Sequence, residues 1–316
     1  MQEEYDSLIA NGMWELAFLP KGRKSVGCKW VFRTKKDSTG EVVRHKARLV
    51  AKGFLQVAGV DFHETFAPVA KFNTIRCILA LGAALDLEIH QMDVKTAFLN
   101  GDLEEDIYMS QPQGFEEKGM EHLVCKLKKS LYGLKQSPRA WYQRIDSFIK
   151  EGFTRCEADH SLYIMQTGEF LLMVLVYVDD LIILASHHAK LEWLKAKLKG
   201  EFQMSDLGEL KYCLGVAFER NCKGRTITMC QRKYIKEVLK RFNMEDCKPI
   251  GTPLDVNVKL MKLSLEEFEA IEGEMEGIPD KAGVGSLMYA MVATRPDLAF
   301  AVSMVSQFMS RAGPSH

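Results

Sequence analysis

The stretch "LVYVDDLIIL", residues 175–184, sets two adjacent carboxylates, Asp179 and Asp180, inside the most apolar run of the chain. The runs "FLLMVLVYV" and "LIILAS" on either side have the length and composition of buried strands joined at the aspartates. A membrane-spanning helix would instead bury each charge at a cost of about 2.5–3.5 kcal/mol, and its polar flanks leave it short of about 20 residues. The sequence therefore predicts a buried β-hairpin with carboxylates at its tip, and no membrane span.

A third carboxylate is expected beside this hairpin. In "LEIHQMDVKTAFLNG", residues 87–101, the segment from Leu87 to Met92 is typical of a strand, and Asp93 stands at its end. If this strand pairs beside the hairpin, Asp93, Asp179 and Asp180 form one cluster whose repulsion a divalent cation would remove. Mg²⁺ prefers such carboxylate oxygens together with substrate phosphates. A solvated acidic turn without a metal is the competing interpretation.

Charge is distributed unevenly along the chain. The 316 residues carry 42 basic and 42 acidic side chains, so the formal net charge is zero. Basic residues nevertheless dominate from Lys21 to Lys52 and from Lys126 to Arg155, whereas the segment from Ser264 to Asp280 has acids and no base. Two basic segments on a neutral protein suit an anionic polymer held in a groove, although two solvated faces would give the same pattern.

The cysteines and the N-terminus indicate an intracellular protein. The 8 cysteines are scattered without zinc-ligand spacing, which is typical of reduced thiols. The first residues, "MQEEYDSLIANGMWEL", lack the basic and apolar regions of a secretory signal.

Five ordered motifs give the chain a family resemblance. They are "KARLVAKGFLQ", "QMDVKTAFLNGDL", "LYGLKQSPRAWY", "YVDD" and "GSLMYAMVATRPDLAFAV", and the similarity around them extends from about Trp14 to Met309. The set resembles the reverse transcriptase of copia-type long-terminal-repeat retrotransposons. The resemblance implies an α+β right-hand polymerase fold, with fingers, an antiparallel palm sheet and a partial thumb or connection. It also implies an RNA-directed DNA polymerase in the cytoplasm (within a virus-like particle) or the nucleus, with deoxynucleoside triphosphates and a primed RNA or DNA template as partners.

The resemblance assigns roles to the acidic cluster and its neighbours. Asp93, Asp179 and Asp180 would bind two Mg²⁺ ions, or Mn²⁺, which serve nucleotidyl transfer to a primer 3′-hydroxyl. Tyr177, which opens the "YVDD" motif, would contact substrate. Phe98 would pack under the nucleotide sugar and exclude a 2′-hydroxyl. From the residues alone, a core phenylalanine is the favoured interpretation of Phe98, because "TAFL" is apolar.

A basic hairpin is expected to hold the triphosphate. The stretch "RTKKDSTGEVVRHKARLVAKG" is typical of two strands joined near "DSTG". The resemblance implies that basic side chains of this hairpin bind phosphate. The candidates are Lys35, Lys36, Lys46 and Arg48, of which Lys46 and Arg48 are the first choice.

The loop before a predicted helix offers another nucleotide contact. In "LKQSPRAWYQRIDSFI", Ser137 is expected as N-cap and Pro138 as the first helical residue. The resemblance places a residue of the preceding loop against the nucleotide. Gln136 and Tyr132 both remain candidates for that role.

The expected domain order is fingers, palm and the start of a thumb over residues 1–250, an acidic linker over 251–283, and the start of a connection over 284–316. That connection would lead toward an RNase H domain, which we expect this chain to lack. Two other functions compete with this one. An aspartic protease needs Asp-Thr/Ser-Gly after a strand, and "DSTG" carries an extra residue. A catalytically inactive retrotransposon fragment, acting at most as a nucleic-acid-binding protein, is the remaining alternative.

Overall fold

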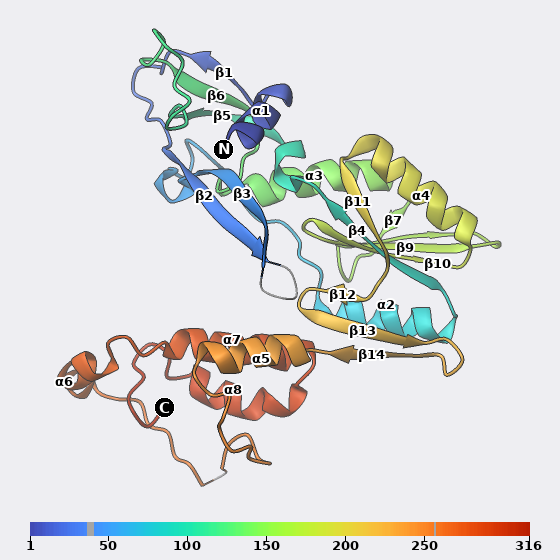
Figure 1. The fold of residues 1–316 in the computed structure, drawn as a ribbon, viewed down its shortest axis with the longest axis vertical. Coiled ribbons are helices and arrows are strands. Elements are labelled where there is room, and N and C mark those ends of the chain that lie inside the picture. The colour runs from blue at the N-terminus through green and yellow to red at the C-terminus, as the bar shows by residue number, and fades with distance from the viewer. Residues whose placement is uncertain (37–40, 256) are drawn as a thin grey trace. The chain divides into compact units, whose positions relative to one another are not determined.

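The structure, a computed structural model, describes residues 1–36, 41–255 and 257–316 (Figure 1). These residues form two compact units. The first comprises residues 1–75 and 87–209, and the second comprises residues 76–86 and 210–316. None of the helices in the described ranges combines the length and apolar character needed to cross a membrane.

A six-stranded antiparallel sheet forms the centre of the first unit. Its strands, in spatial order, are β11 (Met204–Glu209), β4 (Glu88–Val94), β10 (Asp180–Ala185), β9 (Leu171–Tyr177), β8 (Leu162–Gln166) and β7 (Thr154–Arg155). The predicted buried hairpin is therefore β9–β10, and nearly all of its side chains are buried. The expected strand 87–92 is β4, which continues to Val94, so Asp93 lies within the strand rather than after it.

Two helices pack on this sheet. α4 (His188–Glu201) buries Leu191, Leu194 and Leu198, which recur at helical spacing along one face. α3 (Ser137–Lys150) buries Trp141, Ile145 and Ile149 in the same core. Ser137 is not the N-cap of α3 as predicted, because Gln136 occupies that position and the Ser137 hydroxyl donates to the carbonyl of Leu131.

The rest of the first unit surrounds a second core. β1 (Trp14–Ala17), β6 (Val124–Lys129) and β5 (Asp102–Met109) form an antiparallel sheet in that order. β2 (Cys28–Lys36) pairs with β3 (Val42–Ala51), as predicted for the basic hairpin. The "DSTG" segment lies outside the described residues. α1 (Gln2–Ala10) packs against β3, and the short 3₁₀ helices η1 (Gly53–Leu55) and η2 (Ala97–Asn100) complete this part.

The second unit contains a small sheet and several helices. β12 (Tyr212–Cys213), β13 (Val216–Asn221) and β14 (Thr226–Cys230) form its antiparallel sheet. The helices are α5 (Arg232–Arg241), α6 (Leu265–Met275), α7 (Asp280–Ala293), η3 (Pro296–Leu298) and α8 (Ala299–Ser306). α2 (Phe72–Ala84) contributes its later residues to this unit, where Arg76 donates to the last carbonyls of α7, including that of Ala293 at 2.8 Å.

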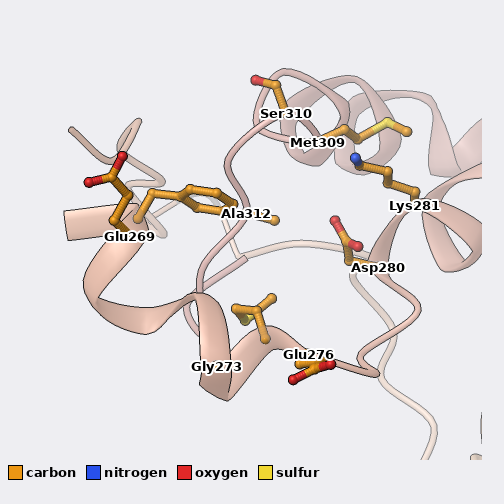
Figure 2. Close-up of a pocket in the computed structure, with 10 residues that line it drawn as sticks. Glu269, Gly273, Glu276, Asp280, Lys281, Met309, Ser310 and Ala312 are labelled. Atoms are coloured by element: carbon orange, nitrogen blue, oxygen red, sulfur yellow. The ribbon is translucent and has the colours of Figure 1, made fainter. Parts of the chain in front are cut away.

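The segment 251–283, expected as an acidic linker, contains α6 and the beginning of α7. α6 begins with a capping box. The Ser264 hydroxyl accepts from the Glu267 amide at 3.1 Å, and the Glu267 carboxylate accepts from the Ser264 amide at 2.8 Å. Acidic residues in the first turn also favour a helix, because they face the positive end of its dipole. α6, the start of α7 and the segment after α8 line a cavity of about 620 Å³, where Glu269, Asp280 and Lys281 are seen in Figure 2.

Candidate active site

The three predicted aspartates lie at one end of the six-stranded sheet. In the antiparallel register, Asp180 is the direct partner of Asp93 on β4 and of Tyr177 on β9. Asp179 lies in the turn between β9 and β10 and is exposed, whereas Asp93, Tyr177 and Asp180 are half-buried. Asp93 and Asp180 therefore face each other across paired strands, and Asp179 precedes Asp180 in the turn.

The turn that carries Asp179 is held from both sides. Val178 has a φ of 57°, a conformation that is rare for a β-branched residue. Its carbonyl accepts from the indole N–H of Trp141 on α3 at 2.6 Å. The next carbonyl, that of Asp179, accepts from the Val94 amide at 2.8 Å. Unfavourable backbone conformations of this kind persist where the surroundings fix them, and they cluster at functional sites.

Asp180 has an environment that disfavours its charge. Burial raises the pKa of the Asp180 carboxyl most, and the nearby charges of Asp179 and Asp93 raise it further. The buried amide of Gln91 acts in the opposite sense, because its Nε2 donates to Asp180 Oδ1 at 2.8 Å. Gln91 was not predicted, although Gln91 and Asp93 are two residues apart on β4 and so share a face.

This donor set suits a hard divalent cation, since carboxylate oxygens are the ligands that Mg²⁺ and Mn²⁺ prefer. Such a cation would also relieve the repulsion that raises the Asp180 pKa. Within residues 1–36, 41–255 and 257–316, no three or more His, Cys, Asp or Glu side chains are already grouped so that they could hold a metal ion. Cation binding would therefore have to draw the aspartates together.

Phe98 lies on η2 and packs edge-on against Tyr132, with ring centroids 5.3 Å apart. Phe98 is half-buried and also contacts the core of the central sheet. The charge of Asp179 acts on the Tyr132 phenol, so this aromatic pair lies near the acidic end of the sheet. Phe98 thus packs partly into the core of the sheet and partly against Tyr132 near the aspartates.

Arg48, on β3, joins the same group. Its guanidinium carbon lies 5.4 Å from the centroid of the Tyr132 ring. Burial raises the pKa of the Tyr132 phenol, and Arg48 lowers it. The Arg48 Nε–H is buried and donates to no atom of the described residues. An unpaired buried donor costs about 1–3 kcal/mol, so a donor kept in this state is a candidate ligand contact.

Lys46 precedes Arg48 by two residues on β3, so both side chains leave the same face of the hairpin. Lys46 is half-buried. Lys35 and Lys36 belong to β2, but their side chains lie outside the described residues. Their assignment as phosphate ligands stays a prediction.

The Tyr132 loop is joined to the end of β3 by backbone contacts. The Ala51 amide donates to the Tyr132 carbonyl at 2.7 Å. Gly133 has a φ of 93°, and a Cβ at Gly133 would overlap the carbonyl of Ala51. A Cβ at Gly53 would likewise overlap the carbonyl of Gly133. Only glycine allows the two segments to approach this closely.

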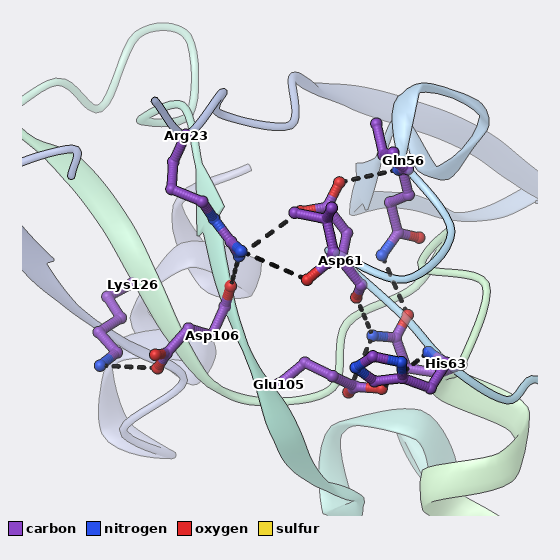
Figure 3. Close-up of polar contacts among 10 residues, drawn as sticks. Arg23, Gln56, Asp61, His63, Glu105, Asp106 and Lys126 are labelled. Carbon is purple, nitrogen blue, oxygen red and sulfur yellow. Dashed lines mark hydrogen bonds and ion pairs between the residues drawn. The ribbon is translucent and has the colours of Figure 1, made fainter. Parts of the chain in front are cut away.

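Gln136 is engaged in a different network. It is 3% exposed, and its Oε1 accepts from Gln56 Nε2 at 3.0 Å. Its Nε2 donates to the Asp61 carbonyl at 2.9 Å and to Glu105 Oε2 at 3.2 Å. Figure 3 shows Gln56, Asp61 and Glu105 in this network. Glu105 and Gln136 also line a cavity of about 480 Å³. Contact between Gln136 and a nucleotide would require these bonds to open, so the geometry favours Tyr132 of the two candidates.

Comparisons with known proteins agree with the sequence motifs. Residues 11–256 match the family described as reverse transcriptase (RNA-dependent DNA polymerase). The whole chain is 49% identical to part of the Retrovirus-related Pol polyprotein from transposon TNT 1-94 of Nicotiana tabacum, and 41% identical to part of that from transposon RE1 of Arabidopsis thaliana. It spans only 24% and 21% of their lengths.

Among solved structures, a truncated apo telomerase from Candida tropicalis matches 72% of this chain and 59% of its own at 9% identity, but the TM-score of 0.29 is too low to bear on the fold. The family match and the two polyproteins confirm the resemblance to copia-type reverse transcriptases. This chain belongs to the reverse transcriptase (RNA-dependent DNA polymerase) family.

Proposed function

We propose that this chain carries the RNA-directed DNA polymerase activity of a Pol polyprotein. The observation that supports it most is the register of β4 against β10, which pairs Asp93 with Asp180 beside a turn that holds Asp179. In the proposed reaction, the primer 3′-hydroxyl gives up its proton to solvent and its oxygen bonds to the α-phosphorus of a deoxynucleoside triphosphate. The bond between the α-phosphorus and the bridging oxygen breaks, and pyrophosphate leaves.

The aspartates are the proposed ligands for two divalent cations, Mg²⁺ or Mn²⁺. Bound cations of this kind lower the pKa of an attacking hydroxyl and stabilise a leaving pyrophosphate. Arg48 supplies its unpaired Nε–H, and Lys46 its ammonium, to the triphosphate. Phe98 and Tyr132 contact the sugar, and Phe98 excludes a 2′-hydroxyl. Tyr177 supports the substrate from the position beside Asp180.

In the right-hand arrangement that we propose, the β2–β3 hairpin belongs to the fingers and the six-stranded sheet is the palm. α5 begins the thumb, and α7 and α8 belong to the connection. A primed RNA or DNA template is the proposed polymeric partner, and its binding is expected to weaken with salt as phosphate contacts are screened. The eight cysteines are free thiols, as is typical of proteins in the reducing environment inside cells.

The second candidate is a catalytically inactive fragment that binds nucleic acid. It is favoured by one observation, namely that the described acidic side chains are not grouped for a metal. A primer-extension assay on poly(rA)/oligo(dT) with Mg²⁺ or Mn²⁺ separates the two. Extension that is lost in Asp179→Asn supports the polymerase. Binding of the template–primer without extension in either metal would support the inactive fragment.

A further inference from the structure

A buried amide stands beside the aspartates of the central sheet. Gln91 lies on β4 and is 5% exposed. Its direct partner on β10 is Ile182, whose own partner on β9 is Leu175, and both of these apolar side chains are buried. An amide buried among apolar side chains costs free energy unless it has a hydrogen-bond partner. Asp180 is that partner, since its Oδ1 accepts from Gln91 Nε2 at 2.8 Å.

The strand register fixes the direction of this bond. Directly paired residues of an antiparallel sheet share a face, and so do residues two apart on one strand. Gln91, Asp93 and Asp180 therefore lie on one face of the sheet. Gln91 is farther from the turn than Asp93, because its partner Ile182 is two residues deeper in β10 than Asp180. The amide thus holds Asp180 Oδ1 from the inner side of the sheet, which leaves the other oxygen, Oδ2, to bind a cation.

The chemistry of the donor suits this position. A charged donor would neutralise Asp180 and repel a divalent cation, whereas an amide donates a hydrogen bond without bringing a net charge. Asp180 can therefore keep its charge for a cation while one of its oxygens is fixed. Hydrogen bonds of this kind orient metal-ligating side chains, and their removal typically weakens metal binding about 10- to 100-fold.

We propose that Gln91 is a positioning residue of the cation site, which fixes the Asp180 carboxylate before a cation arrives. This inference rests on the proposed function, in which Asp93, Asp179 and Asp180 bind divalent cations. In the described part of the chain, the acidic side chains are not yet grouped for a metal. A carboxylate that is already oriented spares the cation part of the cost of ordering its ligands, so the bond from Gln91 strengthens cation binding.

Two other roles for the same bond make different predictions. If it only satisfied two buried polar groups, its loss would lower stability and leave cation affinity unchanged. If it withheld Asp180 from the cation, its loss would tighten cation binding. The sign of the change in cation affinity therefore separates the three roles.

The test compares Gln91→Met with Gln56→Met in the full chain. Methionine has nearly the shape of glutamine but no donor. Gln56 is also 5% exposed, and its Nε2 donates to Gln136 Oε1 at 3.0 Å, so its variant controls for the loss of a buried amide. Mn²⁺ binding is measured by electron paramagnetic resonance of the free ion, without template or nucleotide. We expect Gln91→Met to raise Kd for Mn²⁺ about 10- to 100-fold and Gln56→Met to leave it within about twofold.

Two further variants tie the effect to Asp180. Gln91→Asn keeps an amide that is one methylene shorter and so cannot reach Asp180 without a shift. It should weaken Mn²⁺ binding in the same direction, and it takes the place of Gln91→Met if that variant does not fold. In an Asp180→Asn background, Gln91→Met should have no further effect on Kd, because the carboxylate that it orients is gone.

Primer extension gives a second readout. In Gln91→Met, the Mn²⁺ concentration for half-maximal rate should rise, while KM for dTTP at saturating Mn²⁺ should change little. A Kd for Mn²⁺ that is unchanged or lower in both Gln91 variants would overturn the inference, and so would a wild-type chain whose Mn²⁺ binding does not depend on Asp180.

The binding result does not depend on whether the chain polymerises. Weaker Mn²⁺ binding by Gln91→Met but not by Gln56→Met, in a wild-type chain that extends no primer, would uphold the positioning role and reject the polymerase. Primer extension whose Mn²⁺ dependence and Kd are the same in Gln91→Met as in wild type would do the reverse.

Discussion

The indole N–H of Trp141 donates to the carbonyl of Val178 at 2.6 Å, which links a buried side chain of α3 to the turn that presents Asp179. A helix packed in the core of the sheet thereby helps to fix the position of a proposed metal ligand. This hydrogen bond exists only while the indole is in place, so the link can be tested by one substitution.

Trp141→Phe keeps most of the buried ring and removes the donor. We expect the unfolding free energy to fall by about 1–3 kcal/mol, since the Val178 carbonyl loses its partner, and kcat for primer extension to fall about tenfold. Thermal melts and steady-state kinetics measure the two effects. Trp193→Phe is the matched control, because Trp193 lies on α4 and is 45% exposed. Equal effects of the two substitutions would deny Trp141 a special role.

Asp93→Asn and Asp179→Asn each remove a charge that the proposed cations need. Polymerisation should be lost in both variants. Thermal stability without metal should stay level or rise, because each substitution relieves the repulsion that raises the Asp180 pKa. Melting curves of the metal-free proteins check this. A marked loss of metal-free stability in both variants would mean that these aspartates are structural.

Phe98→Val opens space beside Tyr132. We expect ribonucleotides to be incorporated more efficiently, with a smaller effect on deoxynucleotides, since only the region near the 2′ position changes. The ratio of kcat/KM for dTTP to that for UTP, measured on one template, reports this. An unchanged ratio, together with a fall in thermal stability, would identify Phe98 as a core residue only.

Gln136→Leu should affect folding rather than the nucleotide. It removes an amide that bonds to Gln56, Asp61 and Glu105, so we expect a loss of about 1–3 kcal/mol in unfolding free energy. KM for dTTP should remain close to that of the wild type at a temperature where both are folded, whereas Tyr132→Ala should raise it. A larger KM change in Gln136→Leu than in Tyr132→Ala would restore Gln136 as the nucleotide contact.

His90 makes stability depend on pH. It lies on β4 and accepts at Nδ1 from Lys195 Nζ at 2.8 Å. Burial, followed by the Lys195 charge, lowers the His90 pKa below 6.5. The unfolded chain therefore takes up this proton first as pH falls, so His90 should lower the unfolding free energy between pH 6.5 and its folded pKa.

His90→Gln should remove that part of the pH dependence, and denaturant titrations from pH 7.5 to 5.5 measure it. His188 contributes with the opposite sign, because its bond to Glu88 raises its pKa, and the variant leaves this contribution in place. An identical pH slope in wild type and variant would exclude His90 as its source.

Local patterns carried the prediction of the β9–β10 hairpin and of Asp93. Unbroken apolar runs depend only on neighbours in sequence, whereas the order of the motifs indicated the pairing of distant strands. The choice between Tyr132 and Gln136 depended instead on contacts with residues about 80 positions away, such as Gln56. The helix α6 was not predicted, because its acidic composition is also typical of a linker. The signal for it was "SLEE" at 264–267, which is a capping-box sequence.

The contact between Gly53 and Gly133 has a mechanical consequence. The end of β3 and the Tyr132 loop touch backbone to backbone, because neither Gly53 nor Gly133 places a side chain between them. The two segments therefore form one stiff joint. A hinge motion of the β2–β3 hairpin must pivot beyond Ala51, so the base of the hairpin keeps its distance from the Tyr132 loop when a nucleotide arrives.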